Sequence, residues 1–150
     1  MSHLFQALAE RVGDWRSAHY DCPDYPAMRE ILEFATVHPA TGQLRYLRQA
    51  QFRALETYWY LRLVLNTPRI PDLYATLFPA KSARRAAMGL NSKELTELIA
   101  DTSLEEVIER IQTDNAFVRK HGLESLRETF ALDYPSYILA LAMGAGKTIL

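Results

Sequence analysis

The carboxyl-terminal stretch of the chain is Tyr137-Ile138-Leu139-Ala140-Leu141-Ala142-Met143-Gly144-Ala145-Gly146-Lys147-Thr148-Ile149-Leu150, and the fold class of the whole chain depends on it. Its first half is a continuous apolar run, which is typical of a strand buried in a parallel sheet. Its second half, Gly-Ala-Gly-Lys-Thr, is typical of a phosphate-binding loop at the start of a helix. Residues 134–150 are therefore predicted to be the first strand and a truncated phosphate loop of an α/β nucleotide-binding domain.

The sequence before residue 134 predicts helices, because its apolar residues recur at helical spacing. We expect a helical N-terminal extension over residues 1–42, a buried helix over 43–65 and a helical insertion over 66–133. From residue 51 to 65 this segment is apolar on nearly all sides, with Arg53, Glu56 and Arg62 as its few charges. That pattern indicates a helix buried against more than one neighbour. The predicted fold class is mainly α, ending in part of an α/β domain.

Capping residues predict several helix boundaries. Asn91 with Glu94, and Ser103 with Glu106, stand three residues apart before amphipathic segments, which is the spacing of a capping box. Each pair predicts the start of a helix. The last predicted helix runs from Gly122 to Phe130.

Composition excludes several classes of protein. A chain of 150 residues with 49% hydrophobic residues and a net charge of −1 has the composition of a globular protein. Neither a signal peptide nor an apolar run of about 18 residues is present, so no membrane association is expected and the predicted compartment is the cytoplasm. His19, Cys22 and His38 lack a fourth ligand at a usual spacing, and we predict no metal site for them.

A basic middle third, residues 43–93, lies between two acidic flanks. Within it Lys81, Arg84 and Arg85 are spaced to share one face of a helix. Three cations on one face predict a contact to a nucleic-acid phosphate backbone. The alternative is a solvated helix face, neutralised by the acidic flanks.

The chemistry of the terminal loop follows from its residue types. Gly144, Ala145 and Gly146 allow the backbone to curl so that its N–H groups point at phosphate oxygens. Lys147 would place an ammonium on the β- and γ-phosphates of ATP, and Thr148 would place its hydroxyl on Mg²⁺. The general motif has a glycine where this chain has Leu141.

The string Ala142-Met143-Gly144-Ala145-Gly146-Lys147-Thr148 resembles motif I of the superfamily-two helicases and translocases, in which an apolar residue commonly replaces that glycine. In that superfamily a Q-motif precedes motif I, and its glutamine reads adenine. The stretch Leu47-Arg48-Gln49-Ala50-Gln51 resembles this motif, with Gln51 as the adenine reader, Gln49 as a substitute and Arg48 beside them. The alternative for Gln51 is a surface glutamine on a helix.

The segments 25–65 and 134–150 together resemble the amino-terminal part of the motor subunits of type III restriction enzymes. The resemblance implies a RecA-type motor fold, ATP and Mg²⁺ as cofactors of the full-length protein, DNA as the substrate, and a modification or specificity subunit as a partner. Residues 1–150 lack the acidic strand and the second motor domain of this family, so we expect neither bound nucleotide nor ATPase activity from them alone.

Two other functions remain open from the sequence. The chain would be a small all-α protein-interaction module in which the terminal Gly-Ala-Gly-Lys-Thr is incidental. Alternatively, it would be a helical DNA-binding module that uses the basic middle third.

Overall fold

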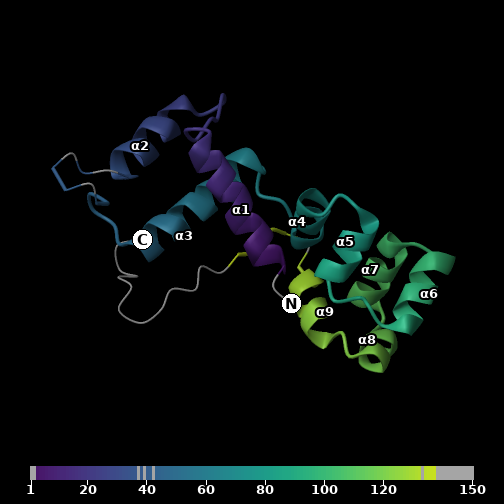
Figure 1. The fold of residues 1–150 in the computed structure, drawn as a ribbon. Helices are drawn as coiled ribbons and strands as arrows, with labels where there is room; N and C mark the ends of the chain where they lie inside the picture. The colour runs from purple at the N-terminus through teal and green to yellow at the C-terminus, as the bar shows by residue number, and fades with distance from the viewer. Residues whose placement is uncertain (1–2, 37, 39, 42, 133, 138–150) are drawn as a thin grey trace. The chain divides into compact units, whose positions relative to one another are not determined.

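The computed structural model describes residues 3–36, 38, 40–41, 43–132 and 134–137, and within these ranges all regular secondary structure is helical (Figure 1). The prediction of a mainly α chain is therefore confirmed for this part. Residues 134–137 belong to no helix or strand. The predicted strand and phosphate loop from residue 138 onward lie outside the described residues.

The described residues form two compact units, each with its own core. The N-terminal unit comprises residues 6–67 with Tyr137, and the C-terminal unit comprises residues 3–5 and 68–136. The division predicted at residues 42 and 43 falls inside the N-terminal unit. The division predicted at residues 65 and 66 falls two residues before that unit ends.

The N-terminal unit is built from α1 (His3–Ser17) from Gln6 onward, α2 (Pro26–Thr36), α3 (Gln49–Trp59) and a π-helix (Tyr60–Val64) that continues α3. Each helix contributes one apolar stripe to a shared core, as its helical spacing predicts. The most buried apolar members of this core are Val12, Trp15, Tyr20, Leu32, Phe52 and Tyr60. Trp15 contacts both Tyr20 and Tyr60, at ring-centroid distances of 5.1 and 5.6 Å.

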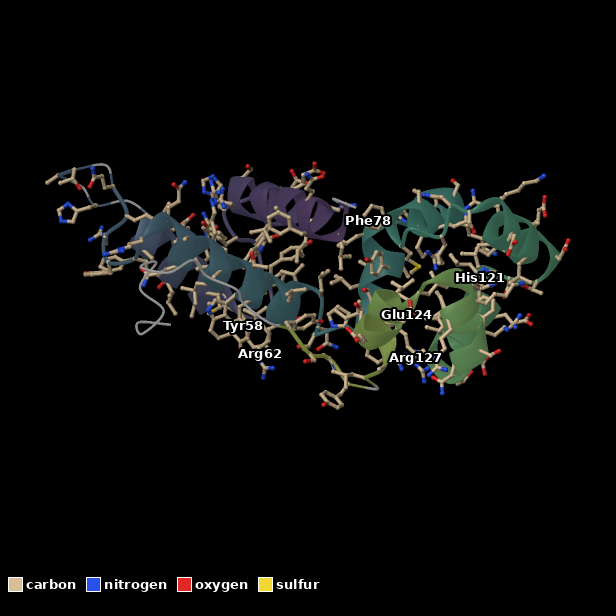
Figure 2. The ribbon with its side chains drawn as sticks, turned by 90° about the horizontal axis from the view of Figure 1, so that it is seen from below. Tyr58, Arg62, Phe78, His121, Glu124 and Arg127 are labelled. Carbon is tan, nitrogen blue, oxygen red and sulfur yellow. The ribbon has the colours of Figure 1, made fainter. Side chains whose placement is uncertain are left out.

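The helix over residues 43–65 is covered less completely than its apolar pattern indicates. Tyr58 is 43% exposed and Val64 is 40% exposed, and Arg62 also lies at the surface (Figure 2). A tyrosine counts as hydrophobic in a sequence pattern, but its hydroxyl allows it to stay in water. The pattern therefore overestimated how much of this helix is covered.

Two turns of the N-terminal unit use left-handed backbone at residues other than glycine. His19 and Tyr20 have φ angles of 56° and 53°, and Asn66 and Thr67 have 54° and 52°. Such conformations cost free energy and persist only where the surroundings hold them. Tyr20 is held by its burial, since it is 2% exposed, and by its backbone N–H, which donates to the Trp15 carbonyl at 2.9 Å.

The C-terminal unit consists of six short helices that pack around one core. They are α4 (Ile70–Leu77), α5 (Lys81–Ala87), α6 (Lys93–Asp101), α7 (Leu104–Thr113), α8 (Asn115–His121) and α9 (Glu124–Phe130). Helix α7 packs against α8 and α9, and α4 packs against α5 and α9 (Figure 1). The centre of the core is apolar and almost fully buried, at Leu90, Leu104, Val107, Ile111 and Phe130.

The predicted capping pairs are correct at one position and wrong at another. Ser103 caps α7, and its Oγ accepts a hydrogen bond from the Glu106 N–H at 3.0 Å. The residue that caps α6 is Ser92 instead of Asn91, with its Oγ 3.3 Å from the Leu95 nitrogen. Neighbouring Asn and Ser are both good caps, so the motif alone does not choose between them.

The predicted helix from Gly122 to Phe130 begins too early. Gly122 has a φ of 63° and ends α8 in the left-handed conformation, and α9 begins at Glu124. A glycine after basic residues is a common helix end, because it adopts this conformation without a steric cost. Helix α8 was absent from the sequence-based interpretation.

Among the described residues, no helix is both long enough and apolar enough to cross a membrane.

Candidate functional site

Only some of the residues predicted to bind ATP lie in the part of the chain that the structure describes. Gly144, Ala145, Gly146, Lys147 and Thr148 all lie outside the described residues. Gln51 and Arg48 lie within them, at the start of α3. The phosphate loop, and the Mg²⁺ contact of Thr148, stay predictions.

Gln51 is buried at the first turn of α3, where it helps to cap the helix. It is 1% exposed, so the alternative of a surface glutamine is wrong. Its Oε1 accepts a hydrogen bond from the backbone N–H of Arg48 at 2.7 Å. Arg48 is the N-cap residue and its side chain is exposed. If the Gln51 oxygen is to accept from the amino group of an adenine, it must share or give up the bond to Arg48.

The three cations proposed to contact a phosphate backbone differ in their surroundings. Lys81 is exposed at the start of α5. Arg84 donates through Nε to the Phe78 carbonyl at 3.3 Å, and its Nη1 lies 3.6 Å from Glu105. The Nε of Arg85 is buried and has no hydrogen-bond partner in the described part of the chain. The contact to nucleic acid stays a prediction, but Arg84 already has partners within its own unit.

A buried charged network in the N-terminal unit was missed by the sequence interpretation. Glu56, on α3, is 0% exposed and receives two hydrogen bonds from Arg16 on α1, at 2.7 and 2.6 Å. The hydroxyl of Tyr20 donates to the same carboxylate at 2.7 Å. The spacing offers a signal that could have found it, since Phe52, Glu56 and Tyr60 recur every four residues on one helix face.

Two members of this network, Arg16 and Tyr20, have raised pKa values and stay protonated at neutral pH. Burial raises the pKa of Tyr20 to about 12, and its hydrogen bond to Glu56 acts in the same direction. The hydrogen bond to Glu56 also raises the pKa of Arg16 above its usual value. A permanently charged arginine and a tyrosine that stays protonated are unsuited to proton transfer near neutral pH. We therefore interpret this network as structural.

The raised pKa of Tyr20 predicts a loss of stability in alkali. An unfolded tyrosine ionises near pH 10, whereas folded Tyr20 keeps its proton up to about pH 12. The contribution is therefore fully present below pH 10 and is lost as the pH rises through that window. Urea unfolding, followed by the fluorescence of Trp15 and Trp59, should show stability falling between these pH values. The fall should be shallower in Tyr20→Phe, and an identical slope in both proteins would contradict the assignment.

The C-terminal unit carries an open surface pocket of about 540 Å³, lined by α6, the end of α7 and α8. Its walls carry both signs of charge, and most of these charges pair with one another. Arg110 lies 3.5 Å from Asp114 and 4.3 Å above the Phe117 ring. Lys120 and His121 lie 3.8 and 3.7 Å from the same oxygen of Glu94. These pairs connect α8 to α6 and α7.

Asp114 is the N-cap residue of α8. Its Oδ1 accepts a hydrogen bond from the Phe117 N–H at 2.9 Å, and this bond lowers the pKa of the carboxyl group. The lowered pKa of Asp114 is therefore explained by its role as a helix cap. Among the described residues, no group of three or more His, Cys, Asp or Glu side chains is placed to hold a metal ion.

Comparison with known proteins adds no relative to these observations: no family model, no curated protein and no solved structure matches the chain.

Proposed function

We propose that the chain carries the amino-terminal nucleotide-binding elements of a superfamily-two ATPase that moves on DNA. The observation that supports this most is the string Ala142-Met143-Gly144-Ala145-Gly146-Lys147-Thr148 after an apolar run. A glycine-rich loop that ends in Lys-Thr suits the β- and γ-phosphates and the Mg²⁺ of ATP. The motor fold proposed for this part is of the RecA type.

The start of α3 supports the proposal independently. In the Q-motif a short Arg-x-x-Gln stretch leads into a helix, and here Arg48 is the N-cap of a helix whose third residue is Gln51. An amide can both donate to and accept from an adenine edge. In the proposed complex Gln51 contacts adenine, Lys147 contacts phosphate and Thr148 contacts Mg²⁺.

The resemblance to type III restriction motors extends the proposal to partners. The proposed substrate is duplex DNA, the proposed partner is a modification or specificity subunit, and the proposed location is the cytoplasm. Rapid phosphoryl transfer also needs an acidic strand that holds Mg²⁺ and an arginine from a second motor domain. The proposal requires both to be encoded after Leu150.

The test uses the polypeptide encoded by the complete reading frame of the native gene. It should hydrolyse ATP in a DNA-dependent manner, and Lys147→Ala should lower the turnover rate on the order of 100-fold, because the loop then lacks its phosphate-binding cation. A coupled assay for released phosphate measures this. Lys93→Ala is the matched control, because this lysine is 89% exposed on α6, and its rate should stay within about twofold of the parent.

Two results would contradict the proposal. One is a stop codon directly after codon 150 in the native gene. The other is a turnover rate in Lys147→Ala that equals the rate in Lys93→Ala.

A small all-α interaction module is the second candidate function. It is favoured by the two helical cores that the described residues form. Under this alternative the native gene ends at codon 150 and Lys147→Ala changes no activity.

A further inference from the structure

The surface of the N-terminal unit carries an exposed aromatic platform, which we define as Phe34, Arg45 and Tyr46. Phe34 lies on α2 and is 52% exposed, and Tyr46, in the segment before α3, is 71% exposed. Their ring centroids are 6.1 Å apart, and their planes are inclined by 33°. The guanidinium carbon of Arg45 lies 3.9 Å from the centroid of Phe34.

The platform is held together by the backbone and faces away from the core. The N–H of Arg45 donates to the Ala35 carbonyl at 3.3 Å, which fixes the segment against the end of α2. Leu44 and Leu47, on either side of the platform residues, pack against the core of the unit instead. Two large aromatic rings therefore stay in water although the core is adjacent, and such exposed apolar groups often mark an interaction site.

The segment that carries Arg45 and Tyr46 is basic, which favours a polyanionic partner. Residues 43–55 contain Arg45, Arg48 and Arg53 and no aspartate or glutamate. Arg48 and Arg53 are exposed at the first turns of α3.

The carboxylates on the neighbouring helix α2 are Glu30 and Glu33. Glu33 lies 3.0 Å from His19 and 3.4 Å from Arg29, so its charge is partly balanced. Glu30 is exposed and is the group on α2 that would repel a phosphate.

We propose that this platform binds single-stranded nucleic acid. An unpaired base stacks on the ring of Tyr46, and the neighbouring ring of Phe34 supports Tyr46. Arg45, Arg48 and Arg53 contact the phosphates. Aromatic rings bind unpaired bases irrespective of their sequence, because every base has a π face, and arginines beside them follow the backbone. In duplex DNA the base faces are stacked on one another and cannot reach Tyr46. This site does not depend on the proposed ATPase.

The test measures the fluorescence anisotropy of a labelled oligothymidylate of about 15 nucleotides, titrated with the 150-residue chain in the absence of ATP. Tyr46→Ala should weaken binding about tenfold or more, and Tyr46→Phe should retain it, because stacking needs the ring and not the hydroxyl. Tyr134→Ala is the matched control, since it removes a ring that is 62% exposed in the C-terminal unit. Its affinity should equal that of the parent chain.

The arginine contacts have their own readout. For single strands the slope of log K against log salt falls by about 0.7 for each phosphate contact that is lost, so Arg45→Gln should reduce it by that amount. Lys93→Gln removes one exposed cation from α6 and should leave the slope unchanged. Glu30→Gln should strengthen binding.

Four results would overturn the assignment: no saturable binding, equal losses in Tyr46→Ala and Tyr134→Ala, equal affinity for a duplex of the same length, or displacement of the oligonucleotide by ATP. Displacement by ATP would assign the platform to a nucleotide cofactor instead. The outcome of the Lys147→Ala test does not affect any of these four results. The ATPase proposal and the platform proposal can therefore be refuted independently of each other. Circular dichroism melts of each variant show whether it is folded.

Discussion

Replacing Arg16 with methionine is expected to destabilise the N-terminal unit by about 3–5 kcal/mol, because it leaves the charge of Glu56 buried without its partner. Glu56 is 0% exposed, and of its hydrogen-bond donors among the described residues the variant keeps the Tyr20 hydroxyl alone. The measurement is equilibrium unfolding in urea at neutral pH. Trp15 and Trp59 are the two tryptophans of the chain and both belong to this unit, so their fluorescence reports its unfolding.

Replacing Glu56, the other member of the ion pair, should lower the stability of the N-terminal unit by less than replacing Arg16. In Glu56→Gln the arginine loses its charged partner, but the Arg16 side chain is 43% exposed and can turn to water. We expect a loss of about 1–2 kcal/mol, typical of weakened hydrogen bonds to a charged group. The double variant Arg16→Met with Glu56→Leu should recover most of the stability, since apolar replacement of a buried ion pair is often neutral. If Arg16→Met costs less than Glu56→Gln, Glu56 is not buried as a charged group.

Replacing Phe130 with alanine is expected to destabilise the C-terminal unit by about 3–5 kcal/mol, since a large side chain is removed from a closed core. Phe130 is 1% exposed at the end of α9, and its ring meets Tyr74 edge to face at a centroid distance of 6.0 Å. Its carbonyl also accepts a hydrogen bond from the Gln112 side chain at 2.9 Å. Hydrogen exchange of the amides in α7 and α9 measures the loss, because this unit has no tryptophan.

Tyr134→Ala provides the comparison for this core variant. It lies four residues from Phe130 but is 62% exposed, so its effect should stay within about 0.5 kcal/mol. A loss below about 1 kcal/mol in Phe130→Ala would show that the core can collapse around the missing ring, contrary to the close packing described above.

The helical pattern of the C-terminal unit was largely predictable, because its signals are local. Ser103 caps α7 as predicted, and the apolar residues Leu104, Val107 and Ile111 return every three or four positions to one face. Where the prediction failed, two local signals competed. Asn91 and Ser92 are equally good caps, and Gly122 suits the end of one helix as well as the approach to the next.

The surroundings of the candidate site residues were not predictable from local signals. Sequence identified Gln51 as a candidate, but its burial and its bond to Arg48 depend on how α3 packs. Similarly, the pattern placed Arg84 on a basic face, whereas the folded unit directs its guanidinium to the Phe78 carbonyl and Glu105. A side chain's partners are set by segments distant in sequence, which periodicity does not describe.

The sequence by itself determined that residues before 134 form amphipathic helices, since the period of apolar residues and the capping side chains act within a few residues of the chain. It also supplied the whole basis for the nucleotide-binding proposal at Gly144–Thr148. Only the tertiary structure decided that Glu56 is buried with Arg16 and Tyr20, from α1 and the turn after it, and that Phe34, Arg45 and Tyr46 meet at the surface. The physical reason is that burial and ion pairing depend on contacts between distant segments, such as Arg16 and Glu56, which are 40 residues apart and which no local pattern connects.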